Sequence, residues 1–292
     1  MIKNKNPFFS VLIPTYNHGH LIRKCLDSVL AQTYTNWEVI VVNNFSTDNT
    51  EEVVHSYHDK RIKLINFSNN GVIAKSRNRA IEEAKGEWLC FLDSDDWWTS
   101  DKLSSCLKYM DNNDLIYHSL RVVSENGEGK KLKLRQINPS HFIDDFFTRG
   151  NPIPNSSVVL RKSIQEKIGL INDDKGLIGV EDADYWLRIS SVTKNIYYIN
   201  RCLGYYWVGE NTSYSIKQLE REKKLYDLYW KKISIKYLNK SQTFLLFSCA
   251  RILHLNRNEE AIEYYLKVLK GSKDILYIMK SIIGIFLMKI NK

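Results

Sequence analysis

The sequence lacks the features that define several classes of protein. Its five cysteines are scattered and form no C-x-x-C pair, which argues against both a disulfide framework and a zinc site. Residues 1–6 are polar, and the apolar run that follows ends at Pro14, so we expect no signal peptide. These absences predict a cytoplasmic protein.

Glycine-rich phosphate-binding loops are also absent. The sequence contains neither G-x-G-x-x-G after its first apolar run nor G-x-x-x-x-G-K-[ST]. A phosphate ligand would therefore have to be held by a metal ion and by cationic side chains. The most apolar segment, residues 275–288, is interrupted by Lys280 and is shorter than the ~20 residues that a membrane-spanning helix requires.

The charge of the chain is concentrated in its last quarter. Residues 1–216 contain 26 basic and 26 acidic residues, whereas residues 217–292 contain 16 basic and 7 acidic ones, so the tail carries the whole net charge of +9. A basic tail suggests an anionic partner, either phospholipid or nucleic acid. A helical segment with a well-solvated outer face explains the charge equally well.

The first hundred residues predict alternating strands and helices. Apolar runs of strand length cover residues 8–13, 37–42, 61–66 and 87–92, and stretches with helical periodicity connect them. This order predicts an α/β fold, with a parallel sheet covered by helices. We expect a further strand at 115–120, a hairpin or loop at 124–133, and another strand at 157–160.

A second module follows, because no strand pattern is evident after about residue 215. Four helical segments are predicted at 215–236, 241–256, 258–270 and 274–290. We therefore predict two domains: a catalytic α/β domain at 1–214 and an all-helical C-terminal module at 215–292.

Polar clusters follow three of the predicted strands. They start at Pro14, Asn43 and Asp93, and ligands of an open parallel sheet bind beyond the carboxyl ends of its strands. The last cluster holds three carboxylates within four residues, at 93, 95 and 96. Crowded carboxylates need a compensating cation, and oxygen ligands favour Mg²⁺ or Mn²⁺ with a bound diphosphate. The simpler alternative is an N-cap for the helix that begins near Thr99.

Several segments closely resemble the family 2 glycosyltransferases with the GT-A fold. They are PTYNHGHLIRKCLDSVLAQTY, VVNNFSTDNT, NNGVIAKSRNRAIEEAKGEWLCFLDSDDWW and EDADYWLRI, and the likeness covers roughly residues 8–210. The resemblance implies a Rossmann-like, mostly parallel sheet flanked by helices. It also implies an inverting, Mn²⁺- or Mg²⁺-dependent transfer of a sugar from a nucleoside-diphosphate carrier to an acceptor hydroxyl, in bacterial polysaccharide assembly of the O-antigen type.

The resemblance also implies roles for individual residues. Asp95 matches the metal ligand of the family, and Asp182 matches its general base. The positions that match its nucleotide-binding residues are Pro14, Thr15, Tyr16, Asn17, Asn43, Arg77, Asn78, Asp93 and Ser94.

One position departs from the family pattern. Asn43 stands where the family usually has an aspartate that accepts a hydrogen bond from a pyrimidine base. An amide oxygen still accepts such a bond, although without charge the bond is weaker. A UDP-sugar is the favoured donor, and another base stays open. A catalytically silent nucleotide-binding or scaffold protein of a glycan-assembly complex is the alternative function, and the intact Asp93, Asp95 and Asp182 argue against it.

The tail suggests contact with a membrane surface. Its apolar last segment is flanked by lysines, which is typical of a helix lying on anionic lipid. Packing of the same residues against the preceding helices is the alternative. We expect peripheral attachment at the cytoplasmic face of the inner membrane, a glycan acceptor that can be linked to polyprenyl diphosphate, and no nucleic-acid partner.

Overall fold

The computed structural model describes residues 6–209 and 215–290. Its internal contacts group the chain into two compact units. The sheet unit consists of Met1–Pro139, Pro152–Asp173 and Glu181–Gly209, and the helical unit of Ser140–Asn151, Asp174–Val180 and Glu210–Lys292. The domain boundary predicted at residue 214 lies outside the described residues. Two segments from earlier in the chain belong with the helical tail.

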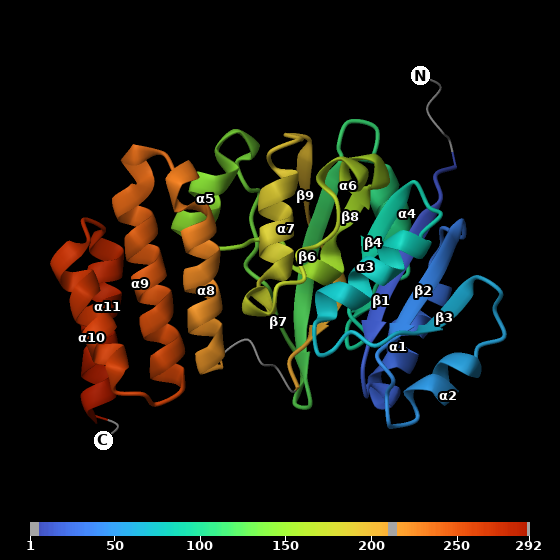
Figure 1. Cartoon of the computed structure of the whole chain (residues 1–292), viewed down its shortest axis with the longest axis horizontal. Coiled ribbons are helices and arrows are strands. Elements are labelled where there is room, and N and C mark those ends of the chain that lie inside the picture. Colours follow the sequence, from blue (N-terminus) through green and yellow to red (C-terminus); the bar gives the residue numbers. More distant parts are fainter. Residues whose placement is uncertain (1–5, 210–214, 291–292) are drawn as a thin grey trace. The chain divides into compact units, whose positions relative to one another are not determined.

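The sheet unit is built on one mixed sheet (Figure 1). Its strand order is β3-β2-β1-β4-β8-β6-β9-β5, and β7 pairs with β6. The strands are β1 (Phe9–Thr15), β2 (Trp37–Asn43), β3 (Ile62–Asn66), β4 (Trp88–Phe91), β5 (Trp97–Trp98), β6 (Leu115–Ser124), β7 (Gly127–Lys131), β8 (Val159–Arg161) and β9 (Ile196–Trp207). The first four strands pair in parallel, as predicted, and β8 lies antiparallel between β4 and β6.

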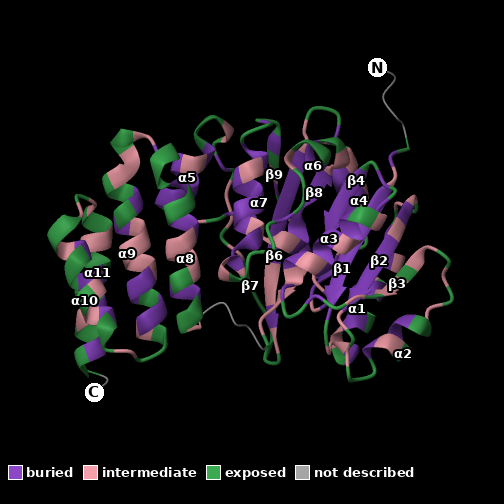
Figure 2. Ribbon diagram, viewed as in Figure 1, coloured by how far each residue is buried: buried purple, intermediate pink, exposed green. Residues whose placement is uncertain are grey.

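Helices cover both faces of this sheet, and its central strands are buried (Figure 2). On one face, α1 (Gly19–Leu30), α2 (Thr50–His55) and α4 (Lys102–Leu107) share one hydrophobic cluster with alternate residues of β1, β2 and β4. On the other face, α3 (Ile73–Glu83) contacts β1 and β2, and α7 (Glu181–Ile189) packs its aromatic rings against Phe91 of β4. The short α6 (Lys162–Ile168) lies against α7.

The sequence did not predict β5 or the long strand β9. β9 pairs in parallel with β6 and antiparallel with β5, and its register with β6 shifts near Ser119. Its side chains do not alternate cleanly between buried and exposed, and Asn200 and Arg201 interrupt its apolar pattern. The hairpin expected after residue 115 is confirmed, since β6 continues to Ser124 and β7 folds back on it.

The helical unit contains α5 (Phe142–Arg149), α8 (Ile216–Tyr229), α9 (Leu238–Leu255), α10 (Glu260–Gly271) and α11 (Ile275–Ile290). The helical C-terminal region is therefore confirmed, although the first predicted helix ends at Tyr229. α5 belongs here because Asp144 accepts hydrogen bonds from the backbone N–H and the hydroxyl of Ser234, both at 2.7 Å. Among the described residues, no helix combines the length and the apolar character needed to cross a membrane.

Candidate functional site

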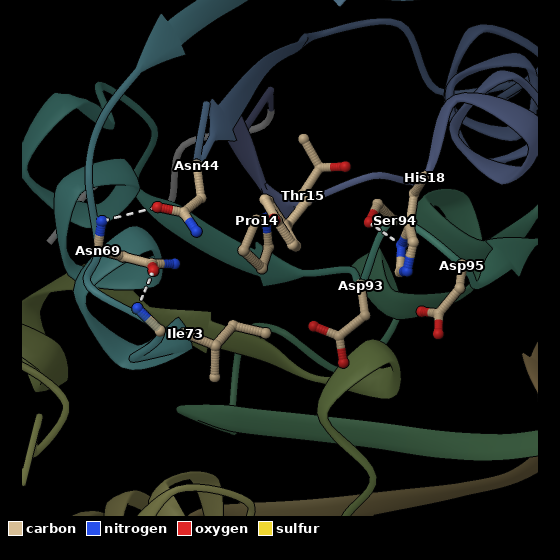
Figure 3. A pocket seen from close by; sticks show the side chains of 11 residues that line it. Pro14, Thr15, His18, Asn44, Asn69, Ile73, Asp93, Ser94 and Asp95 are labelled. Atoms are coloured by element: carbon tan, nitrogen blue, oxygen red, sulfur yellow. Dashed lines mark hydrogen bonds between the residues drawn. The ribbon is translucent and has the colours of Figure 1, made fainter. Parts of the chain in front are cut away.

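A pocket of about 360 Å³ opens at the carboxyl edge of the sheet, beyond β1 and β4 (Figure 3). It lies where the strand-end clusters of the sequence predicted a ligand. Its lining consists of Pro14, Thr15, Tyr16, His18, Asn44, Asn69, Gly71, Ile73, Asp93, Ser94 and Asp95.

The end of β1 contributes one wall of the pocket. The hydroxyl oxygen of Thr15 is buried and has no hydrogen-bond partner within the described part of the chain, although the residue itself lines the pocket. Asn17 does not line the pocket. It adopts a left-handed backbone conformation (φ 52°), and its side-chain oxygen accepts a hydrogen bond from the backbone N–H of Thr47 at 2.8 Å. Asn17 therefore fixes the loop after β2 rather than contacting the pocket.

The loop after β2 places Asn44, and not Asn43, on the pocket. Asn43 is fully buried, its amide donates to Asn66 at 2.8 Å, and its oxygen accepts from the hydroxyl of Ser46 at 2.6 Å. Successive side chains at a strand end point to opposite sides, so the neighbouring Asn44 faces the pocket instead. There its oxygen accepts a hydrogen bond from the backbone N–H of Asn69 at 2.9 Å.

The turn after β4 presents two of its acidic side chains on the pocket. Asp93 and Asp95 point to the same side (Figure 3), while Ser94 between them is held by a 2.7 Å hydrogen bond to the ring of His18. The side-chain amide of Asn155 donates to Asp93 at 3.0 Å. Sequence analysis gave His18 no role, although this bond places it beside the predicted metal ligand.

Two carboxylates of this turn, Asp95 and Asp96, have raised pKa values. Burial and the negative charge of Asp93 raise the pKa of Asp95 to about 6. Asp96 is fully buried behind the pocket, where burial and both neighbouring charges raise its pKa well above the usual value. One oxygen of Asp96 accepts the backbone N–H of Trp207 at 2.9 Å. Asp93 and Asp95 are therefore the carboxylates of this turn that line the pocket, while Asp96 holds β9 to the turn.

Arg77 joins this turn to the start of α7. Its guanidinium donates to Asp93 at 2.7 Å and to Glu181 at 2.6 Å, a residue 104 positions away in the sequence, and its side chain is 5% exposed. Burial alone would lower the pKa of Arg77, but the two carboxylates raise it, so the cation is retained. Arg77 lies outside the pocket lining and holds two acidic segments together.

Asp182 follows Glu181 and lies within the electrostatic influence of this bridge. Burial and the charge of Glu181 raise the pKa of Asp182 to about 7, against the opposing charge of Arg77 and a 2.7 Å hydrogen bond from the N–H of Ala183. A carboxyl group with this pKa is protonated and deprotonated near neutral pH, as a general base requires. Asp182 does not line the pocket itself.

Comparison with known proteins identifies the family. The family described as "Glycosyl transferase family 2" matches residues 10–167, which is more than half of the chain. The chain belongs to glycosyl transferase family 2. It is therefore a glycosyltransferase, and the resemblance noted in the sequence is confirmed.

Individual relatives agree with this assignment. The chain is 29% identical to the putative teichuronic acid biosynthesis glycosyltransferase TuaG of Bacillus subtilis, over 77% of this chain and 88% of the relative. It is 38% identical to the Escherichia coli UDP-Glc:alpha-D-GlcNAc-diphosphoundecaprenol beta-1,3-glucosyltransferase WfgD, over 40% of this chain and 47% of the relative. The structure of S. aureus TarS 1-349 in complex with UDP-GlcNAc superposes with a TM-score of 0.59 at 18% identity, covering 96% of this chain and 90% of that one, which supports the GT-A fold.

The donor set of this glycosyltransferase fits a metal ion that is also held by its substrate. Within the described residues, no group of three or more His, Cys, Asp or Glu side chains could hold an ion alone. Mg²⁺ and Mn²⁺ sites often use one or two carboxylates and take their other ligands from phosphates and water. Asp95, with Asp93 beside it, offers that minimal set at the pocket.

Asn78 has a structural role in this glycosyltransferase. It is buried, and its amide donates to the carbonyl of Ile171 at 2.8 Å while its oxygen accepts the N–H of Ile171 at 2.9 Å. Both the nitrogen and the oxygen of the amide are therefore hydrogen-bonded to the backbone at Ile171. Asn78 holds this loop in place and does not line the pocket. Besides His18 and Asn44, the sequence did not predict the lining residues Asn69, Gly71 and Ile73, which follow β3, where no acidic or proline-containing motif marks a strand end.

Proposed function

We propose that the protein is an inverting, metal-dependent glycosyltransferase that moves a sugar from a nucleoside-diphosphate sugar to an acceptor hydroxyl. The observation that carries this proposal is the Arg77 bridge between Asp93 and Glu181. It links Asp93 at the donor pocket to Glu181, the residue next to Asp182, whose pKa suits a base. Two acidic segments far apart in sequence thus serve one reaction.

The donor is proposed to be a UDP-sugar held in the pocket at the carboxyl edge of the sheet. The exposed ring of Tyr16 offers the base a stacking surface, and Thr15 lines the same wall of the pocket. The amide of Asn44 lies where we expect the pyrimidine ring, so it takes over the reading of the base that the sequence assigned to Asn43. The UDP-GlcNAc complex of TarS and the donor in the name of WfgD support a uridine carrier.

Asp95 is proposed to hold a Mn²⁺ or Mg²⁺ ion together with the diphosphate. The ion would neutralise the charge that develops on the departing diphosphate. Asp93 is already engaged by Arg77, so it orients the turn and limits how far Asp95 can move. At a pKa of about 6, Asp95 is ionised at neutral pH and able to ligate.

Asp182 is proposed to act as the general base. As the acceptor oxygen bonds to the anomeric carbon of the donor, the hydroxyl proton passes to Asp182, and the bond from that carbon to the diphosphate breaks with its electron pair. A single displacement of this kind inverts the configuration. Arg77 and Glu181 hold the start of α7 in place, so the base keeps its position relative to the turn after β4.

The acceptor is proposed to be a growing bacterial surface polysaccharide at the cytoplasmic side of the membrane. Two relatives support this acceptor: TuaG is described as a putative teichuronic acid biosynthesis glycosyltransferase, and WfgD as acting on a diphosphoundecaprenol-linked sugar. A polyprenyl-diphosphate-linked acceptor follows by analogy.

Calorimetry and a transfer assay test this assignment together. Wild-type protein should bind UDP in the presence of Mn²⁺, and Asp95→Asn should lose the metal-dependent part of that binding. Asp182→Asn should bind normally but lose transfer by a factor of about 10² or more. Asp96→Asn is the matched control, because Asp96 does not line the pocket and an amide oxygen can still accept the N–H of Trp207, so binding should persist.

Two results would contradict the proposal. Failure of the wild-type protein to bind any nucleoside diphosphate with either metal would favour a silent scaffold protein. Retention of configuration, seen by NMR of the product linkage, would exclude the single displacement.

A further inference from the structure

The last helix, α11, exposes most of its large apolar side chains, whereas two of its three buried residues are small and the third is Met288. A surface helix normally shows the opposite arrangement. Its buried side includes Ser281 and Gly284. A Cβ added to Gly284 would lie 2.4 Å from Cζ of Tyr265. Its exposed apolar residues are Ile275, Leu276, Met279, Ile282, Ile283, Phe286, Leu287 and Ile290. We name these eight side chains the α11 face.

The α11 face is continuous and bordered by cations. At about 100° per residue, its eight side chains fall within an arc of about 140° around the helix axis. Lys280 lies just beyond one edge of this arc and Lys289 just beyond the other, and both are exposed. Lysines at such positions lay their methylene chains along apolar surface and extend their ammonium groups toward water or phosphate.

A groove beside the α11 face adds aromatic rings and a second cation. Two pockets of about 310 Å³ and 850 Å³ share Phe247, Arg251 and Lys280 in their linings. The ammonium group of Lys280 stands 5.4 Å from the ring centre of Tyr277 and 5.9 Å from that of Phe247. Aromatic and basic side chains together are typical of surfaces that meet the headgroup region of a bilayer.

We propose that the α11 face lies on an anionic phospholipid surface, with the helix in the plane of the interface. Two bordering lysines would contact headgroup phosphates while the apolar arc enters the acyl boundary. Charge selects this occupant over a second copy of the chain, because residues 217–292 hold 16 basic and 7 acidic residues and two such surfaces repel each other. Packing against the preceding helices, the alternative left open by the sequence, accounts for Ile285 and Met288 but not for the α11 face, whose side chains do not join that core among the described residues.

This inference goes beyond the proposed transfer chemistry. The α11 face contains none of the residues that line the donor pocket. An experiment can therefore contradict the proposed membrane contact without contradicting the proposed transfer reaction, and the reverse. Its consequence for function is that the enzyme would be concentrated where a lipid-linked acceptor resides.

Co-sedimentation of the full chain with vesicles tests the proposal. Vesicles of phosphatidylcholine alone and vesicles with added phosphatidylglycerol should differ, with binding only to the anionic ones and weakening as salt rises. Ile282→Glu combined with Phe286→Glu should abolish binding, since both side chains are more than half exposed on the α11 face. The matched control is Ile235→Glu, whose side chain is 88% exposed in the same unit but outside the face, and it should bind as the wild type does.

Charge reversal supplies the second arm. Lys280→Glu with Lys289→Glu should weaken binding by at least about 25-fold, because one cation near an anionic surface is worth about fivefold. Lys60→Glu in the sheet unit is the matched control and should not alter binding. Far-UV circular dichroism of each variant verifies that its helices are intact.

The outcomes separate the possible occupants of the face. Equal binding of the face variants and the wild type, or no binding of the wild type to anionic vesicles, overturns the proposal. A wild-type dimer in light scattering that the Ile282→Glu/Phe286→Glu variant loses, without vesicle binding, would assign the face to a second copy instead.

Discussion

Neutralising the proposed base should make the protein more stable, with a dependence on pH. The charged form of Asp182 is disfavoured by burial and by Glu181, which raise its pKa from 3.8 to about 7. The folded state therefore holds this proton more tightly than the unfolded state does. Between these two values the folded state binds more protons, so the free energy of unfolding falls as pH rises.

The magnitude follows from the size of the shift. This rise in the pKa of Asp182 corresponds to about 4 kcal/mol in the free energy of unfolding, at 1.36 kcal/mol per pKa unit. Asp182 is partly exposed, and water screens its charge, so we expect about 1–2 kcal/mol to be gained above pH 7 in Asp182→Asn. The Asn side chain keeps an oxygen for the N–H of Ala183, and the unfolding midpoint should rise by about 2–8 °C at pH 8.

Thermal unfolding at pH 4 and pH 8 measures the effect, since the gain should nearly vanish at the lower pH. Asp184→Asn on the same helix is the matched control. Asp184 is 3% exposed and accepts a 2.9 Å charged hydrogen bond from Arg188, so its neutralisation should destabilise the protein by about 1.5–3 kcal/mol. If Asp182→Asn raised the unfolding midpoint equally at both pH values, or at neither, the result would refute the reasoning.

Further predictions concern the site and the helical unit. Transfer should rise with pH and reach half its maximum near pH 7, because Asp182 must lose its proton to act, and rates measured from pH 5.5 to 8.5 check this. Calorimetric Mn²⁺–UDP binding should weaken as pH falls through about 6, where Asp95 becomes protonated, and a flat profile would contradict its role as ligand. Arg77→Lys should lower transfer by about 10²-fold and stability by about 3 kcal/mol, as one ammonium cannot span both carboxylates, and unchanged kinetics would remove its positioning role. Gly284→Ala should cost about 1–3 kcal/mol in denaturant unfolding through its clash with Tyr265.

Local patterns in the sequence were sufficient for the first half of the sheet. The apolar runs that became β1 to β4 are short, rich in β-branched residues and bounded by polar clusters, so both their pairing and their common edge could be predicted. β9 could not, because it is stabilised by β6 and β5 from distant parts of the chain and not by its own alternation.

For the site, residue type indicated the chemistry but not the direction of each side chain. Asp93 and Asp95 were found from their spacing and position, and both line the pocket. Asn43 and Asn78 match the family pattern equally well, yet their amides are occupied within the protein. Neighbouring residues of a strand point to opposite sides, so a shift of one position changes which side chain faces the ligand. Only the packed structure determines which residue that is.

The sequence by itself determined the parallel half-sheet, the acidic turn after its fourth strand, the family and the basic helical tail, because each depends on residues close together in the chain. Tertiary structure alone decided that Arg77 joins Asp93 to Glu181, that Asn44 replaces Asn43 at the pocket, and that α11 turns its large apolar side chains outward. Contacts between distant segments depend on how whole helices and strands pack. The periodicity within one helix or strand does not indicate which other elements it contacts.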